Sequence, residues 1–315
     1  MESKEKNFVS VVIYVHNAEK WIANFLSTVI PVVEEYFEHA EVICVDDHSD
    51  DGSVEQIKAF RTSEGNLSIS VLHMSYFHGV EAAMNAGVEL SIGDFVFEFD
   101  SPIPDFDGQE IMRVYRRALQ GYDIVTAVPK QRQRLTSQLF YKVFCHFTEI
   151  AANMHTERFR ILSRRVINRI DSMNKAVPYR KAVYANCGLK MDTIVYQPIE
   201  KGLAGKKMTD REERKYRKGL ALKALILYTD VGYKFGVGMT VFMMLVSIAV
   251  AVYSLAIYAL ARPVAGWTTT ILFFSVAFFG LFAILTIVIK YLQMLVELVF
   301  RRKRYSFESI EKLTK

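Results

Sequence analysis

The stretch that decides the fold is Ala40-Glu41-Val42-Ile43-Cys44-Val45-Asp46-Asp47, in which a run of apolar and β-branched residues leads directly into two acids. Such a run is typical of a buried strand. The same pattern recurs in Val96-Phe97-Glu98-Phe99-Asp100. A carboxylate at the end of a buried strand can hydrogen-bond a base or ribose, or bind a hard metal ion through oxygen. We therefore expect functional roles for Asp46 and Asp100. The polar residues that follow Asp47 are expected only to form a turn and a helix cap: Asp50, Asp51 and Ser53.

Working outward from this stretch, strand and helix patterns alternate along the chain. Apolar runs predict five strands: Phe8–Val15, Ala40–Val45, Leu67–Leu72, Asp94–Phe99 and Asp123–Ala127. Helical periodicity predicts four helices between them: Glu19–Tyr36, Val54–Phe60, Val80–Leu90 and Gln109–Leu119. This alternation predicts an α/β fold, a mixed and mostly parallel sheet with helices on both faces. Ligands of such sheets bind beyond the carboxyl ends of the strands, where Asp46 and Asp100 fall.

The composition divides the chain into two halves. Residues 1–200 contain 21 Lys and Arg against 27 Asp and Glu, whereas residues 201–315 contain 18 against 7. Aromatic residues make up 13% of the chain, which excludes an intrinsically disordered protein. The chain has three cysteines, which show no zinc-binding spacing and fit a reducing compartment: Cys44, Cys145 and Cys187.

The second half contains two long stretches without charge, Phe235–Leu260 and Val264–Ile289, each of 26 residues. As a helix, each is about 39 Å long, enough to cross a hydrocarbon core of about 30 Å. The connector Ala261-Arg262-Pro263 is short, so the two helices are expected to form a transmembrane hairpin. The alternative, two buried helices of a large soluble core, is disfavoured because such helices do not need charge-free runs of this length.

The charges that flank the hairpin predict its orientation. Lys201–Lys223 holds nine basic and three acidic residues, and Arg301-Arg302-Lys303-Arg304 follows the second span. By the positive-inside rule both ends face the cytoplasm. Since no apolar segment follows the charged Met1–Asn7, we expect no cleaved signal peptide.

Four regions are therefore predicted. Residues 1–205 form a cytoplasmic catalytic-type domain, 206–233 a basic interfacial helix, 234–300 the hairpin (about 235–260 and 264–296), and 301–315 a basic cytoplasmic tail. Leu135–Met154 is a second candidate for an interfacial helix, with an ordinary packed helix as the alternative.

Several motifs resemble those of family 2 glycosyltransferases. Val45-Asp46-Asp47-His48-Ser49-Asp50-Asp51-Gly52-Ser53 is similar to the family motif V-D-D-G-S-x-D-G-S/T, and Ser10–Glu19 is similar to the opening strand S-V-V-x-P-x-Y-N-E. Gly79–Gly87 resembles the G-x-x-A-x-N-x-G helix. Asp100 falls where the family has its metal-binding D-x-D. The resemblance implies the GT-A fold, which is Rossmann-like, and transfer of a sugar from a nucleotide donor.

Other segments resemble one branch of that family, the polyprenyl-phosphate glycosyltransferases related to dolichol-phosphate mannose synthase. Gly121-Tyr122-Asp123-Ile124-Val125 is similar to that branch, as is Arg158–Val166, where the branch usually reads D-F-R-L-x-x-R-x-V. The two-span anchor and Lys290–Tyr305 fit the same branch. The resemblance covers nearly the whole chain.

The resemblance implies a set of site residues. Asp100 would be the catalytic residue and the metal ligand, with Mg²⁺ or Mn²⁺ as cofactor. The donor nucleotide would be bound by Tyr14, His16, Asn17, Glu19, Asp46, Asp47 and Asn85. The acceptor phosphate would be bound by Lys130, Arg132, Arg160 and Arg164.

The partners implied are a UDP- or GDP-linked sugar and a polyprenyl phosphate, undecaprenyl phosphate in a bacterium. Inversion of the anomeric centre, a plasma-membrane location and a tetramer are also implied, and no nucleic acid is expected. The acceptor phosphate is already a nucleophile, so a general base is dispensable.

The chain departs from the family pattern at the expected metal site. Asp100-Ser101-Pro102 lacks the second acid of D-x-D, and Arg158 stands where the branch carries Asp. Two interpretations follow. Either a cation is held by Asp100, the donor diphosphate and water, with Glu98 or Asp105 as further candidates, or the protein is a nucleotide-sugar sensor or partner subunit without turnover. A processive polysaccharide synthase is disfavoured, because two spans cannot enclose a channel and no Q-x-x-R-W motif is present.

Overall fold

The computed structural model describes residues 4–60, 67–130, 157–172, 179–199, 231–261, 266–299 and 307–313. The chain divides into two compact units, Met1–Leu222 together with Arg302–Lys315, and Lys223–Arg301. Part of the predicted linker 206–233, the whole of Leu135–Met154 and Arg132 lie outside the described residues.

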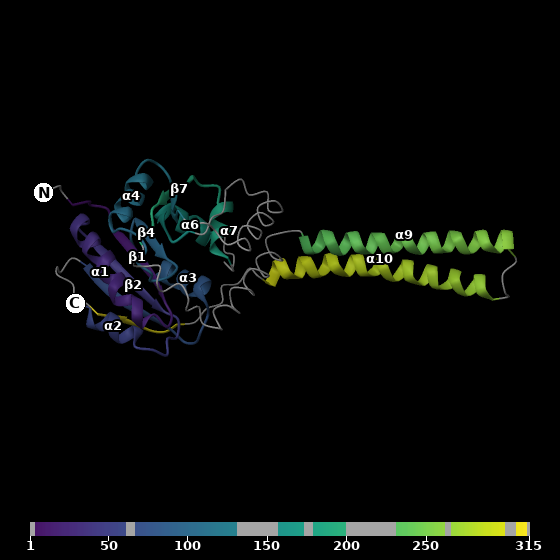
Figure 1. The fold of residues 1–315 in the computed structure, drawn as a ribbon, viewed down its shortest axis with the longest axis horizontal. Helices are drawn as coiled ribbons and strands as arrows, with labels where there is room; N and C mark the ends of the chain where they lie inside the picture. The colour runs from purple at the N-terminus through teal and green to yellow at the C-terminus, as the bar shows by residue number, and fades with distance from the viewer. Residues whose placement is uncertain are drawn as a thin grey trace. The chain divides into compact units, whose positions relative to one another are not determined.

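The larger unit is an α/β domain with its helices packed around one sheet (Figure 1). The sheet has eight strands among the described residues, in the order β7-β5-β6-β4-β1-β2-β3-β8. The strands are β1 Val9–Val15, β2 Ala40–Asp46, β3 Leu67–Met74, β4 Phe95–Phe99, β5 Ile124–Pro129, β6 Phe159–Ser163, β7 Met191–Tyr196 and β8 Phe307–Lys312. The helices of this unit are α1 Glu19–Tyr36, α2 Ser53–Ala59, α3 Val80–Leu90, α4 Gln109–Ala118, α6 Arg164–Ser172 and α7 Arg180–Asn186.

Both faces of the sheet are covered by helices. Successive residues of a strand point to opposite sides, so each strand contributes side chains to both cores. In β1, Val11 and Ile13 belong to the core that includes α1 and α4, whereas Val12 and Tyr14 belong to the core that includes α3. A strand buried on both faces reads as a continuous apolar run, which is why β1 and β2 were legible in the sequence.

The predicted α/β fold class is confirmed, and each of the nine predicted elements lies within a residue or two of its expected ends. Strands β1, β2, β3 and β4 run parallel to one another, so their carboxyl ends meet at one edge. Strand β6 was not predicted. It runs antiparallel between β4 and β5 and places Arg160 directly opposite Glu98.

The C-terminal region differs from the sequence prediction of a basic tail over 301–315. Strand β8 pairs antiparallel with β3 and forms one end of the sheet. The backbone NH of Leu313 donates to the carbonyl of Ile69 at 2.8 Å, and the Leu313 side chain packs against the core. This strand was not predicted, because it has only six residues and three of them are charged, a composition typical of an exposed segment.

The smaller unit consists of α9 Val231–Ala261 and α10 Trp267–Val299, which pack against each other. Lys234–Leu260 and Trp267–Leu292 are long and apolar enough to cross a membrane. Small and polar residues lie at the contact between them: the hydroxyl of Thr286 donates to that of Thr240 at 2.8 Å, and Ser247 and Ser254 are buried. Such residues allow helices to approach closely in lipid.

The order of elements along the chain constrains how the hairpin is inserted. Strand β7 precedes α9 and β8 follows α10, yet both strands belong to the same sheet. Because a folded sheet lies on one side of a membrane, the chain must enter and leave any bilayer that the hairpin crosses from that same side.

We predict the corresponding labelling pattern for single cysteines introduced at exposed positions. Lys20→Cys in α1 and Ser309→Cys in β8 should react with a membrane-impermeant maleimide from the same face of sealed vesicles, and Thr269→Cys in the first turn of α10 only from the other face. The native Cys44 and Cys187 are buried, so they contribute little background, and Cys145 is replaced by serine in all three variants. Labelling of all three variants from one face would contradict a transmembrane hairpin.

Candidate active site

The parallel strands bring two predicted site residues to the same edge of the sheet. Asp46 is the last residue of β2, and Asp100 follows β4 directly. Strand β1 lies between β2 and β4, and it leads into His16 and Asn17 at this edge. The candidate site therefore lies at the carboxyl ends of β1, β2 and β4, where sequence analysis expected it.

Asp47 is fully buried and holds the loop before α3. Its carboxylate accepts hydrogen bonds from the Tyr14 hydroxyl at 2.9 Å and from the backbone NH groups of His78 and Gly79 at 2.8 and 2.7 Å. Gly79 has φ +85°, a conformation that favours glycine. Three donors on one buried carboxylate fix this loop, so Tyr14 and Asp47 shape this edge of the sheet from within the fold.

The loops after β1 and β2 are joined to each other by a set of hydrogen bonds. The Asn17 side-chain oxygen accepts from the backbone NH of Asp50 at 2.9 Å, and the Ser53 hydroxyl accepts from the NH of Ala18 at 2.7 Å. The Glu19 carboxylate lies so close to Gly52 that a Cβ there would meet it at 2.8 Å. Asn17 and Glu19 thus lie at the predicted nucleotide side. Ser53 joins the two loops but does not cap α2, which begins at Ser53 and has no side-chain cap.

The remaining nucleotide-side residues differ in their surroundings. Asp46 is nearly buried and accepts from the backbone NH of Ser49 at 3.1 Å. His16 Nδ1 lies 2.9 Å from the Asp47 carbonyl oxygen, while its Nε2 is buried without a hydrogen-bond partner. Asn85 lies half-buried in α3. Their contacts with a nucleotide stay predictions.

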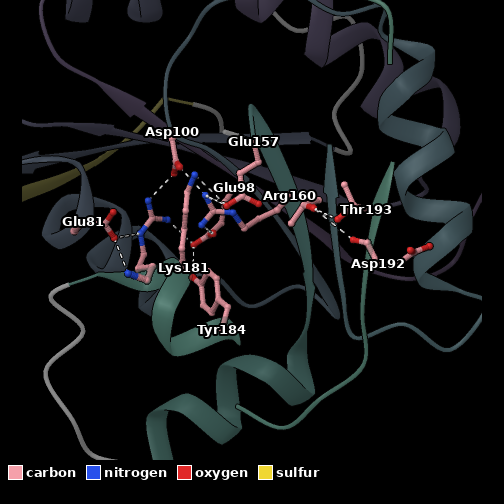
Figure 2. Close-up of polar contacts among 11 residues, drawn as sticks. Glu81, Glu98, Asp100, Glu157, Arg160, Lys181, Tyr184, Asp192 and Thr193 are labelled. Carbon is pink, nitrogen blue, oxygen red and sulfur yellow. Dashed lines mark hydrogen bonds and ion pairs between the residues drawn. The ribbon is translucent and has the colours of Figure 1, made fainter. Parts of the chain in front are cut away.

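A buried network of charges surrounds Asp100, as Figure 2 shows. Arg160 of β6 donates to one Asp100 oxygen at 2.6 Å, and Arg180 of α7 donates to the other at 2.5 Å. The same two guanidinium groups donate to Glu98, at 2.9 and 2.8 Å. Both arginine side chains are essentially unexposed, whereas 24% of the Asp100 side chain is exposed.

The network extends to α3 and to the start of α7. Arg180 also donates to Glu81, from its backbone NH at 2.8 Å and its Nε at 3.1 Å. The Tyr184 hydroxyl donates to Glu98 at 2.7 Å. Glu157 is shared by Arg160 at 3.3 Å and Lys181 at 3.2 Å. Four carboxylates and three cations thus neutralise one another to within one charge, which buried charges require.

This network sets the protonation state of Asp100. Burial alone would raise the pKa of Asp100, but the positive charges of Arg160, Arg180 and Lys181 outweigh burial and hold its pKa below the ordinary value. Burial raises the pKa of Glu81 in spite of the opposing charge of Arg180. Asp100 is therefore an ionised carboxylate at the exposed margin of the network.

Asp105, a further candidate metal ligand, is occupied by another pair. It is fully buried, and the Nε of Arg158 lies 2.9 Å from both of its oxygens. The Tyr196 hydroxyl donates to it at 3.1 Å. The arginine that stands in place of the family's Asp thus has a partner of opposite charge, which explains how the fold accommodates the change.

The four residues predicted to bind the acceptor phosphate are not all brought together. Lys130 is exposed and follows β5 directly, and Arg160 is buried against Glu98 and Asp100. Arg164 lies at the opposite end of β6, where its guanidinium donates to the carbonyl of Gly93 at 2.8 Å. Four residues of strand separate it from Arg160 by about 13 Å, so we leave Arg164 out of the site.

The carboxylates allow a test of whether the site fits a divalent cation. The described residues contain no group of three or more His, Cys, Asp or Glu side chains that could hold a metal ion. Each Asp100 oxygen accepts one of the guanidinium hydrogen bonds above, so it keeps a further lone pair. Mg²⁺ is often bound through one or two carboxylates together with substrate phosphates and water. Asp100 therefore fits a cation that takes its other ligands from a diphosphate and water.

Sequence reasoning missed Arg180, Glu81 and Tyr184. No motif marks α7, and a buried arginine cannot be told from an exposed one by its neighbours in the chain. The one available signal was Glu81, an acid in the first turn of α3, but the helix dipole favours an acid at that position without any buried partner.

An α/β sheet with acids at the carboxyl ends of its central parallel strands binds its ligands at that edge. The family model for glycosyl transferase family 2 matches residues 10–173, just over half of the chain. The chain belongs to glycosyl transferase family 2.

Characterised and uncharacterised members of the family resemble parts of the chain. An uncharacterized glycosyltransferase of Synechocystis sp. is 27% identical over 194 residues, 60% of this chain and 60% of that protein. The undecaprenyl-phosphate 4-deoxy-4-formamido-L-arabinose transferase of Aeromonas hydrophila is 36% identical over 133 residues, 42% of this chain and 40% of that protein. The chain thus spans between two fifths and three fifths of the length of these relatives.

Solved structures resemble the fold more distantly. Glucosyl-3-phosphoglycerate synthase from Mycobacterium tuberculosis, in complex with Mn²⁺, UDP and glucosyl-3-phosphoglycerate, has a TM-score of 0.46 and 12% identity, covering 70% of this chain and 78% of that one. Mannosyl-3-phosphoglycerate synthase from Rubrobacter xylanophilus has a TM-score of 0.46 and 16% identity, covering 70% and 73%.

We predict that Arg180→Met destabilises the protein strongly. The change leaves Glu81, Glu98 and Asp100 without one of their cations, and breaking a buried ion pair from one side typically costs about 3–5 kcal/mol. The free energy of unfolding, measured by denaturant titration of the larger unit's fluorescence, should fall by that amount.

Arg113→Met is the matched control, because Arg113 is 55% exposed and pairs with Glu110 at 3.1 Å. Such a surface pair contributes about 1 kcal/mol or less. Equal losses in the two variants would contradict the importance of the buried network.

Proposed function

We propose that the protein is a membrane-anchored glycosyltransferase that moves a sugar from a nucleotide donor to a polyprenyl phosphate. The observation that carries the proposal is the ionised Asp100 at the carboxyl end of β4, partly exposed and held by two buried arginines. Family membership, the named undecaprenyl-phosphate transferase among the relatives and the two apolar helices support it.

The donor nucleotide is proposed to lie across the carboxyl ends of β1 and β2. Asp46 would contact the base or ribose. The loop joined by Asn17 and Glu19 would line the pocket, and Asp47 would hold the shape of that pocket through Tyr14 and Gly79. A preorganised loop of this kind binds a ligand without first having to be ordered.

Asp100 is proposed to act at the donor diphosphate. A bound Mg²⁺ or Mn²⁺ would supply positive charge that stabilises the nucleoside diphosphate as it leaves. Asp100 stays ionised because Arg160 and Arg180 lower its pKa. Its position is fixed from both oxygens, which keeps the carboxylate from moving as charge develops.

The acceptor phosphate is proposed to bind with Lys130 as its exposed cation. Attack of the phosphate oxygen on the anomeric carbon forms the new C–O bond, and the bond to the donor diphosphate breaks with inversion. An ionised phosphate has no proton to lose, so none of the carboxylates needs to act as a base. Arg160 acts through Asp100 and Glu98 in this proposal, and Arg132 stays a predicted phosphate ligand.

A second candidate function is favoured by the same network. Both oxygens of Asp100 are occupied by guanidinium groups, and Pro102 stands in place of the second acid. A nucleotide-sugar sensor or partner subunit would need this fold but no turnover. Measured transfer separates the two functions.

We predict formation of a lipid-linked sugar when purified protein is incubated with undecaprenyl phosphate, Mg²⁺ or Mn²⁺ and a panel of labelled UDP- and GDP-sugars. Asp100→Asn should lower the turnover about 100-fold or more, because it removes a preorganised charge at the reacting diphosphate. Extraction of labelled lipid and thin-layer chromatography give the measurement.

Asp192→Asn is the control, because Asp192 takes no part in the network around Asp100. Its carboxylate pairs with Arg117 Nε at a distance of 2.5 Å. Its turnover should match that of the wild type. The absence of product across the panel would favour the sensor, and an unchanged rate in Asp100→Asn would refute the role of that residue.

We also predict that the cation binds together with the donor rather than before it. Asp100 alone offers few ligands, so Mn²⁺ without nucleotide should bind weakly, and UDP or GDP should tighten it by at least tenfold. Calorimetric titration of Mn²⁺ with and without nucleotide measures this coupling. Tight Mn²⁺ binding that persists in Asp100→Asn without nucleotide would contradict it.

A further inference from the structure

The C-terminal strand contributes a side chain to the nucleotide side of the candidate site. In the pairing of β3 with β8, His73 lies opposite Ser309 and Val71 lies opposite Glu311. Residues two apart on a strand share a face, so Glu311 is a diagonal neighbour of His73, within reach of a long side chain. Its Oε2 lies 3.6 Å from His73 Nε2.

His73 also faces Asp46, the residue opposite it in the pairing of β2 with β3. His73 Nδ1 lies 3.2 Å from Asp46 Oδ2. The imidazole is therefore placed between two carboxylates, one from each neighbouring strand. A neutral imidazole donates from one nitrogen only, and an imidazolium donates from both.

The two Asp46 oxygens have separate partners. Ser49 NH donates to Oδ1 at 3.1 Å, and His73 faces Oδ2. Ser49 belongs to the loop that follows β2 at the candidate site, whereas His73 and Glu311 belong to the neighbouring strands β3 and β8. Asp46 is nearly buried, so without His73 its Oδ2 would be left unpaired, and the carboxylate, held by Ser49 alone, would be free to turn.

Glu311 is itself held in place from α2. Lys58 Nζ lies 2.6 Å from Glu311 Oε2. The hydrogen bond from Lys58 lowers the pKa of Glu311, so this residue carries a negative charge toward His73. The side chains follow one another along this face in the order Lys58, Glu311, His73 and Asp46, so the imidazole has a carboxylate on each side.

We propose that His73 and Glu311 are positioning residues for the donor nucleoside, which hold the Asp46 carboxylate in one orientation. The inference rests on the proposed function, in which Asp46 contacts the donor. It makes nucleotide binding depend on a strand that follows the membrane hairpin in the chain.

The test is calorimetric titration of the full chain in detergent with UDP and with GDP, without acceptor lipid. His73→Ala should weaken binding about tenfold, because a nearly buried carboxylate loses its partner. His73→Asn, whose side-chain NH₂ can replace Nδ1 as a donor, should recover most of that loss. Glu311→Gln should weaken binding about threefold, as expected for a half-exposed charge.

Glu55→Gln is the matched control, since Glu55 is an exposed acid of α2 in the same part of the molecule. It should bind nucleotide as the wild type does. With sugar donors, His73→Ala should raise KM while kcat is kept, because an interaction made equally in the ground and transition states affects binding alone.

If His73 and Glu311 only stabilise the sheet, their variants should unfold more easily but, where folded, bind nucleotide as tightly as the wild type. Thermal unfolding of each variant shows whether it is folded, and a folded His73→Ala with unchanged nucleotide affinity would overturn the proposal. Equal losses in Glu55→Gln and Glu311→Gln, or a wild type that binds neither nucleotide, would also overturn it. A wild type that binds nucleotide but transfers no sugar would instead refute the proposed function.

Discussion

Two guanidinium groups buried between carboxylates are the constraint on which the candidate site depends. Arg160 and Arg180 come from β6 and α7, and they join β4 to α3 through Glu98 and Glu81. Neither arginine could be buried without these acids, and the Glu98 side chain could not be buried in the middle of a sheet without the arginines that donate to it. The same two arginines hold both oxygens of Asp100 and keep it ionised at the margin of the network. The ion pairs that stabilise this part of the sheet thus also fix the state of the acid at its edge.

This arrangement gives a physical meaning to the changed motif. A second acid near Asp100 would add negative charge to a network that is already balanced to within one charge. Pro102 adds none, and Arg158 has its own partner in Asp105. The departures from the family pattern are thus compatible with one another, because each acid still present near the site, Asp100 and Asp105, is bound by arginine. Any cation then has to obtain most of its ligands from the substrate.

Much of the fold was legible in the sequence, because strands buried on both faces read as apolar runs and the helices between them keep their period. Asp46 and Asp100 were legible because each follows such a run. The network was not, because its members lie on four separate elements and only the folded sheet brings them together. Arg164 was grouped with Arg160 because they are close in sequence, but β6 is extended and carries them to opposite ends. Strand β8 was missed because charged residues in so short a segment obscure the alternation of apolar and polar side chains that marks a strand.

Strand β8 also has a consequence for how the protein is made. Its partner β3 is synthesised early, whereas β8 emerges from the ribosome only after both apolar helices. Until then the outer side of β3 presents unpaired backbone groups, a state that invites pairing with other chains. Completion of the sheet therefore has to wait until both apolar helices have left the ribosome, so the pairing of β8 with β3 is the last step in the assembly of the sheet.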